Sequence, residues 1–254
     1  MASKAWVAYQ NLLEQAAVVT ASSAVVGYPS RYAYDWSTAT YWQPVGIGTH
    51  TLQVEFSSPV SADYLALYRH NFALANASIK LQYDDGVMWV DCFDAMTAAD
   101  NQLVFKRFHQ QTSSLWRIVI TSNQPVFIGV LMFGQALNLE RGMSEGFTPP
   151  RHGRDDTILD STSEGGAFLS SRLIRQGAES DLTINWVTSA WLRQHGEPFM
   201  AHARLKPFVF SWNDINYPQD VCFCKVKGKI NNSSIKARGW QSMSMRLNCL
   251  LSGE

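Results

Sequence analysis

Alternating, aromatic-rich segments separated by turn residues constrain the fold of this chain more than any other feature. Residues 51–56 and 78–83 place an apolar side chain at every second position. A period of two sends successive side chains to opposite faces of a strand, so each segment is expected to bury one face. The spacing of such segments, with no long helical period between them, predicts antiparallel β-structure of the sandwich or jelly-roll kind.

The pattern divides the chain into two β domains. We predict a jelly-roll sandwich over residues 1–140, a linker or arm over 141–160 that contains Pro149 and Pro150, and a second β domain over 161–254. Asp84, Asp85 and Gly86 predict a tight hairpin turn, because these residues tolerate the positive φ that such turns need. One helix is expected near 188–205.

Composition favours assembly over nucleic-acid binding. Of 254 residues, 46% are hydrophobic and only 17% are charged, and the formal net charge is zero. A neutral chain lacks the electrostatic footprint of a nucleic-acid partner or an anionic membrane, and no apolar run is long enough to span a bilayer. Low charge together with nine tryptophans predicts extra burial at subunit interfaces.

No group of residues predicts catalysis, a metal site or a cofactor. Cys222 and Cys224 are two apart and are expected to share one sheet face as small hydrophobic residues, while Cys249 follows alone. Buried free thiols are therefore favoured over zinc. His195 and His202 lack a carboxylate partner at ligand spacing, so a structural role is favoured for both. We expect a protein that is not an enzyme.

The first half resembles the galactose-binding-like (discoidin-type) β-sandwich family. The residues that carry the resemblance are Thr-Ala-Ser-Ser at 20–23, Gly-Tyr-Pro at 27–29, Asp35, and Tyr-Trp at 41–42. The resemblance implies a sandwich whose loops at one end contact ligands. Within it, Trp42 would close the bottom of the barrel and Asp35 would cap backbone donors of the first loop.

The second half resembles distal-tail and tail-tip adaptor proteins of long-tailed bacteriophages. The resemblance rests on the order of Leu-Thr-Ile-Asn-Trp at 182–186, the helical segment, Phe-Ser-Trp at 210–212 and Val-Cys-Phe-Cys-Lys at 221–225. It implies a structural virion protein that forms a ring, a hexamer in this family, and joins the tail tube to the tip and hub proteins. Residues 1–4 are followed by no apolar leader segment, so we expect synthesis in the host cytoplasm and a final place in the virion tail.

The alternative function is adhesion through recognition of host-surface glycans by the sandwich. Aromatic rings stack on the apolar faces of sugars, and one loop region concentrates such rings beside polar residues. The competing interpretation is that these rings pack the rim of the sandwich or a subunit interface. The candidate glycan or partner contacts are Tyr32, Tyr34, Trp36, Tyr41, Arg69 and His70.

Overall fold

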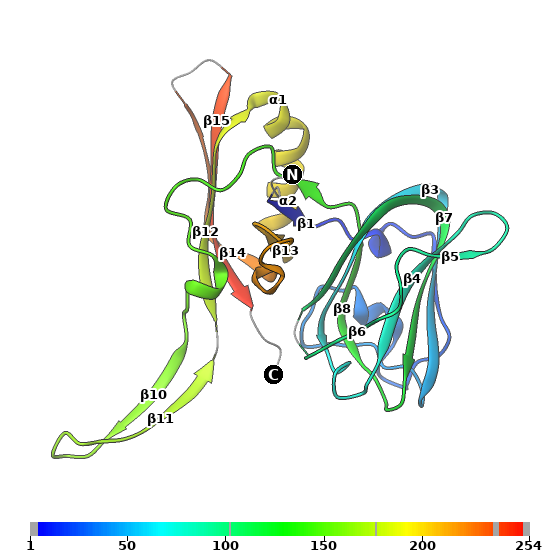
Figure 1. The fold of residues 1–254 in the computed structure, drawn as a ribbon, viewed down its shortest axis with the longest axis horizontal. Helices are drawn as coiled ribbons and strands as arrows, with labels where there is room; N and C mark the ends of the chain where they lie inside the picture. Colours follow the sequence, from blue (N-terminus) through cyan, green and yellow to red (C-terminus); the bar gives the residue numbers. More distant parts are fainter. Residues whose placement is uncertain (1–4, 102, 176, 236–238, 251–254) are drawn as a thin grey trace. The chain divides into compact units, whose positions relative to one another are not determined.

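The computed structural model describes residues 5–101, 103–175, 177–235 and 239–250 and is mainly β, with antiparallel sheets (Figure 1). The predicted fold class is thereby confirmed. Contacts divide the described residues into two compact units. The sandwich unit comprises residues 8–136, and the hairpin unit comprises residues 5–7 and those from 137 onward.

The sandwich unit is built on a sheet in the order β2-β3-β7-β4-β5, with β6 paired to β4 and β8 paired to β3. Two short 3-10 helices, η1 (Leu12–Glu14) and η2 (Ser30–Ala33), lie in the loops before the long strands. The strands are β2 (Val18–Ala21), β3 (Gly48–His70), β4 (Ser78–Asp84), β5 (Trp89–Asp91), β6 (Met96–Thr97), β7 (Val104–Ser122) and β8 (Ile128–Gly134).

Strand β3 is long enough to take part in two regions of the sheet. Its first part pairs with β2, and its last part pairs with β8. Strand β7 pairs with β3 along both parts, with register shifts after Glu55 and Ala62. The shifts let one strand bend and serve both parts of the sheet. Leu52 from the first part and Leu65 from the second therefore lie in one hydrophobic core, together with the fully buried Trp42.

The hairpin predicted at Asp84, Asp85 and Gly86 is present between β4 and β5. Asp84 pairs with Trp89 across the turn, and Gly86 has a φ of 93°. The Asp84 carboxylate accepts a hydrogen bond of 2.8 Å from the Gly86 backbone N–H. This is the turn chemistry expected of Asp and Gly.

The hairpin unit contains a six-stranded sheet in the order β12-β15-β14-β13-β1-β9, so strands from both ends of the chain belong to it. Short 3-10 turns η3 (Pro150–His152) and η5 (Pro218–Asp220) lie between its strands. The strands are β1 (Trp6–Ala8), β9 (Leu137–Asn138), β10 (Thr157–Thr162), β11 (Phe168–Arg175), β12 (Ala178–Thr188), β13 (Phe208–Ser211), β14 (Cys222–Ser234) and β15 (Trp240–Leu250).

The predicted helix is present as α1 (Ser189–Trp191), a π-turn η4 (Leu192–Gly196) and α2 (Glu197–Ala203) in succession. The Thr188 side chain caps its start by accepting from the Trp191 N–H at 3.2 Å. Gly196 and Pro198 would weaken the interior of an α-helix, and Pro198 has no backbone N–H to donate. The wider π-turn before Pro198 accommodates this missing donor, and the helix continues as α2. Among the residues that the structure describes, no helix is long and apolar enough to cross a membrane.

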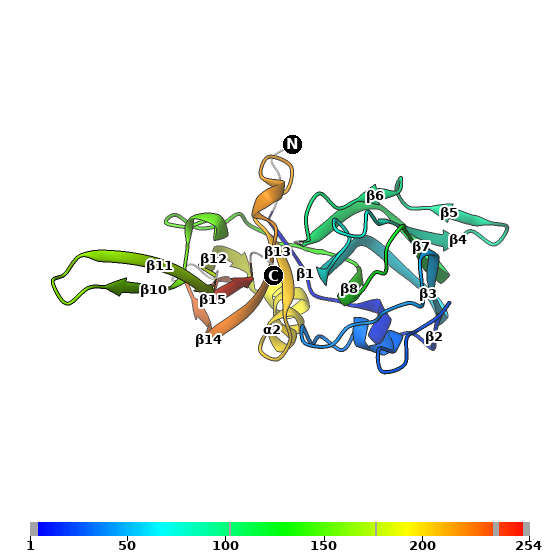
Figure 2. The ribbon, with the colours of Figure 1, turned by 90° about the horizontal axis from the view of Figure 1, so that it is seen from below.

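Strands β10 and β11 form a separate two-stranded hairpin that extends beyond the six-stranded sheet of its unit (Figures 1 and 2). Every residue of β10 is exposed. Strand β10 begins at Thr157, within the stretch that the sequence predicts as a linker.

Candidate functional site

The loops that precede β3 in the sandwich unit border an open hollow of about 590 Å³, here called the loop hollow. Its polar and aromatic lining comes from η1, from η2 and from the two residues after η2, and includes Glu14, Arg31, Tyr32, Tyr34 and Asp35. The Arg31 guanidinium lies 5.4 Å from the centre of the Tyr32 ring. Partial burial raises the pKa of Tyr34, against a smaller lowering by Arg31, so its hydroxyl stays protonated at neutral pH.

Trp36 lies at the edge of this loop region and adopts a φ of 64°, a conformation that side-chain-bearing residues rarely take. Its indole N–H donates to the Glu14 carboxylate at 2.7 Å. The Asp35 carboxylate accepts from the Ser37 N–H at 2.9 Å and from the Thr40 hydroxyl at 2.7 Å, as its predicted capping role requires. These bonds fix the loop in one conformation.

The other predicted contacts lie apart from the hollow. Tyr41 stacks on Tyr28 with ring centres 4.6 Å apart, and its ring is 5.1 Å from Phe127. His70 is buried, and its Nδ1 accepts from the Phe72 N–H at 3.2 Å, so the ring supports the turn after β3. Of the six predicted residues, Tyr32 and Tyr34 line the hollow, whereas Trp36, Tyr41, Arg69 and His70 do not.

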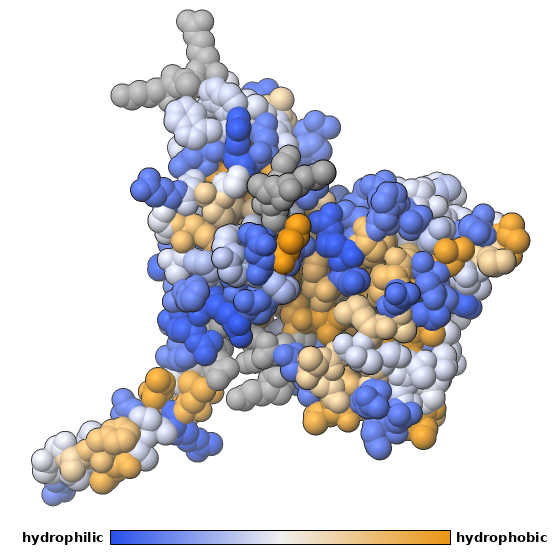
Figure 3. Space-filling model, in the orientation of Figure 1, coloured by the Kyte–Doolittle hydropathy of each residue, from blue (hydrophilic) through white to orange (hydrophobic). Residues whose placement is uncertain are grey.

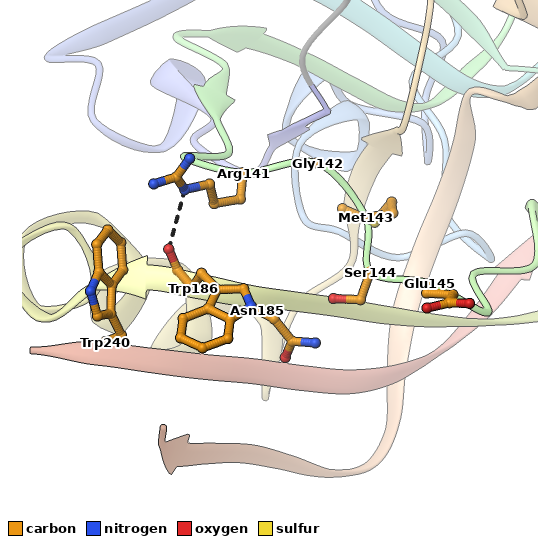
Figure 4. Close-up of a pocket in the computed structure, with 8 residues that line it drawn as sticks. All are labelled: Arg141, Gly142, Met143, Ser144, Glu145, Asn185, Trp186 and Trp240. Atoms are coloured by element: carbon orange, nitrogen blue, oxygen red, sulfur yellow. Dashed lines mark hydrogen bonds between the residues drawn. The ribbon is translucent and has the colours of Figure 1, made fainter. Parts of the chain in front are cut away.

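A second hollow, of about 680 Å³, lies in the hairpin unit and is here called the tryptophan hollow (Figure 4). Trp186 on β12 and Trp240 on β15 present their indoles to it. The Arg141 Nε donates to the Trp186 carbonyl oxygen at 3.2 Å, and its guanidinium lies 5.4 Å from the centre of the Trp240 ring. The Ser144 hydroxyl borders the hollow and is buried without a hydrogen-bond partner among the described residues.

Backbone strain sets the position of the Trp186 indole. Trp186 has a φ of 63° and falls in the register shift between Ile184 and Val187, where the pairing of β12 with β15 is interrupted. The side chain is 51% exposed. Left-handed backbone at a bulky residue costs on the order of 1–3 kcal/mol and concentrates at binding sites. No sequence pattern predicts the left-handed backbone at Trp186.

Large apolar side chains cover the β10–β11 hairpin, between 44% and 67% exposed (Figure 3). Ile158 pairs with Leu173, and Leu159 follows Ile158 on β10, so neighbouring apolar residues point to opposite faces. Both faces of the hairpin therefore carry exposed apolar side chains. The six residues, here called the hairpin patch, are Ile158, Leu159, Phe168, Leu169, Leu173 and Ile174.

The cysteine arrangement differs from the sequence-based expectation in one respect. Cys222 and Cys224 share a face of β14 as predicted, but Cys249, expected to stand alone, lies directly opposite Cys224 on β15. All three are buried. The register of β14 against β15, which the sequence does not reveal, brings the third thiol to the other two.

No protein-family model and no curated protein matches this sequence. Solved structures align with about half of it. Chitosan-binding module 1 of a chitosanase/glucanase from Paenibacillus sp. IK-5 is 20% identical, with 49% of this chain and 98% of that chain covered and a TM-score of 0.41. Module 2 of the same enzyme, in complex with chitotriose, is 17% identical over 49% of this chain and 99% of its own, with a TM-score of 0.41.

A pectin-binding carbohydrate-binding module is 18% identical, with 47% of this chain and 90% of that chain covered and a TM-score of 0.39. These structural neighbours are carbohydrate-binding modules, and none of the three is a phage tail protein. At such identities and TM-scores, neither a ligand nor an activity transfers to this chain.

Proposed function

We propose that this chain is a structural, self-assembling subunit of the tail tip of a long-tailed bacteriophage. In this role the hairpin unit joins copies into a ring between the tail tube and the tip or hub proteins, and the sandwich unit docks outer tail proteins. The observation that carries the self-assembly is the hairpin patch. The phage context comes from the resemblance of residues 182–225 to tail adaptor proteins.

The hairpin patch supports self-assembly because the hairpin unit leaves it uncovered. A two-stranded hairpin alone is marginally stable in water, and within the described part of the chain each strand pairs only with the other. Over the two faces, its half-exposed apolar side chains expose on the order of 500 Å² in total, within the size range of the largest apolar patches on monomers, which are often functional. A stable interface needs roughly 800 Å² from each partner, so the hairpin supplies much of one.

The two apolar faces favour a second copy of this chain as the occupant. Ile158 and Leu159 are 55% and 62% exposed on opposite faces, and a single flat surface can cover only one of them. A hairpin inserted between neighbouring copies buries both. Repeated head-to-tail contacts of this kind close into a ring when the rotation between copies allows it.

The tryptophan hollow is a second surface suited to such a contact. Exposed Trp and Arg side chains dominate the energetics of protein interfaces. Trp186 and Arg141 supply both, on the same unit as the hairpin. Its aromatic surface also agrees with the interface burial that the composition predicts.

Electron microscopy of the purified full-length chain tests this proposal. Closed rings of one diameter are expected, and single particles at every concentration would contradict self-assembly. Gold-labelled antibodies against the sandwich unit then test the virion role on phage particles that carry this protein. Label at the tail tip is expected, and label anywhere else, or none, would contradict it.

Carbohydrate binding by the sandwich unit is the second candidate function. The observation that favours it is the loop hollow, in which Tyr32 and Tyr34 lie beside Arg31, Asp35 and Glu14. Aromatic rings offer stacking faces, and the charged groups offer hydrogen bonds to sugar hydroxyls. Such a site would serve host-surface adhesion.

A panel of immobilised oligosaccharides tests the second candidate. Binding that Tyr32→Ala abolishes would support it, with Tyr217→Ala as control, because Tyr217 is exposed in the hairpin unit. The absence of binding to every member, or binding that survives Tyr32→Ala, would count against the loop hollow as a glycan site.

A further inference from the structure

Three cysteine sulfurs converge inside the hairpin unit. The Cys222 Sγ lies 3.1 Å from the Cys224 Sγ, which lies 3.2 Å from the Cys249 Sγ. All three sulfurs lie within 4.8 Å of one another. The side chains are at most 1% exposed.

Two features of the sheet bring these sulfurs together. Cys222 and Cys224 are separated by one residue of β14 and therefore point to the same face. Cys249 is the direct cross-strand partner of Cys224. On the other side of β14, Phe208 and Phe210 pair with Cys224 and Cys222, and the Phe208 ring packs edge-on against Phe199 of α2.

The three sulfurs are close enough to reach one ion. Their separations of 3.1 and 3.2 Å are longer than the about 2.05 Å of a disulfide bond. Zinc binds a cysteine sulfur at about 2.3 Å in tetrahedral geometry, which places two bound sulfurs about 3.8 Å apart. Binding one ion therefore requires the two shorter separations to widen by about 0.6 Å, while the third sulfur separation is already at most 4.8 Å.

We propose that Cys222, Cys224 and Cys249 bind one thiophilic metal ion of the zinc class. The cluster contains no fourth His, Cys, Asp or Glu from the described residues, so one coordination position is left to water or another small ligand. Binding converts three thiols to thiolates and releases their protons to solvent, so affinity falls as the pH falls. The bound ion ties β14 to β15, which are neighbouring strands of the six-stranded sheet.

Cobalt is the first probe, because a thiolate bound to Co²⁺ produces an intense near-ultraviolet charge-transfer absorption that histidine or carboxylate ligands do not. The full-length chain is reduced, stripped of metal with a chelator and titrated with Co²⁺ and then with Zn²⁺. We expect the band to saturate at one equivalent of Co²⁺ per chain and to disappear as Zn²⁺ displaces the cobalt.

Cys249→Ser is expected to abolish the stoichiometric band. Cys92→Ser is the matched control and should leave the band unchanged. Cys92 lies in the sandwich unit, where burial, with a smaller effect from Asp91, raises the pKa of its thiol to about 12. Cys92 is not one of the three converging cysteines, so its replacement removes no ligand.

The melting temperature of the unaltered chain gives an independent readout, because an ion that binds only the folded state stabilises it. One equivalent of Zn²⁺ should raise the melting temperature by several degrees at pH 7.5, and by less at pH 6. A reduced chain with no charge-transfer band and no zinc-dependent shift would overturn the proposal. A full band in the Cys249→Ser variant would do the same.

Discussion

Replacing Leu159 and Leu169 by serine tests whether the hairpin joins copies of this chain. The two side chains are 62% and 60% exposed, so about three fifths of each remains for a partner to bury. Full burial of a leucine contributes about 1.5–3 kcal/mol, so the double substitution removes roughly 2–4 kcal/mol from each hairpin contact. At 1.4 kcal/mol per factor of ten, the dissociation constant between copies should rise by roughly 30- to 700-fold.

Sedimentation velocity over a dilution series measures this shift. The fold of each copy should be unaffected, because substitutions at exposed positions change the free energy of unfolding by about 0.5 kcal/mol or less. Leu74→Ser is the matched control: Leu74 is 78% exposed but belongs to the sandwich unit. It should leave the association of copies unchanged.

Two results would refute this reasoning. Association of the Leu159→Ser/Leu169→Ser variant at the concentrations of the unaltered chain would exclude the hairpin patch as the contact. An equal weakening by Leu74→Ser would mean that general surface hydrophobicity, rather than the hairpin, drives association.

Three further predictions concern the free energy of unfolding, which urea titration monitored by circular dichroism measures. A Cβ at Gly153 would lie 1.9 Å from a backbone carbonyl oxygen of β12, so Gly153→Ala should destabilise the chain by roughly 2 kcal/mol or more, whereas Gly142→Ala meets nothing within 4 Å and should be near neutral. Thr188→Ala removes the cap on the Trp191 N–H and should cost about 1 kcal/mol, and Thr188→Ser should restore most of it. Trp116→Ala empties a fully buried position in the sandwich core and should cost about 3–5 kcal/mol; a loss below about 1 kcal/mol would contradict the packing described.

Local patterns predicted the strands, the hairpin turn and the helix. Alternation marks one-sided burial, and Asp and Gly mark the turn at 84–86, so each signal lies within a few residues of the structure it specifies. Residues 51–56 form part of a much longer strand, β3, because register shifts keep its pairing with β7 through the bend. Periodicity does not predict such shifts.

Long-range pairing accounts for what the sequence did not reveal. Strand β1 lies in the sheet of the hairpin unit, and Cys249 lies beside Cys224. Both placements depend on strand order and register, which no short segment encodes. The left-handed backbone of Trp186 likewise arises where the pairing of β12 and β15 is interrupted. The sequence indicates the aromatic loop as a candidate contact region. It does not indicate which of the rings line the loop hollow, because that depends on the path of η1 and η2.

The mass of the purified chain in solution, measured by light scattering across a concentration series, tests the central claim most directly. A single chain has a mass of 28.5 kDa. The assembly account predicts growth with concentration toward a fixed multiple of that mass, lost in the Leu159→Ser/Leu169→Ser variant. A mass that stays at one chain at every concentration would contradict self-assembly through the hairpin.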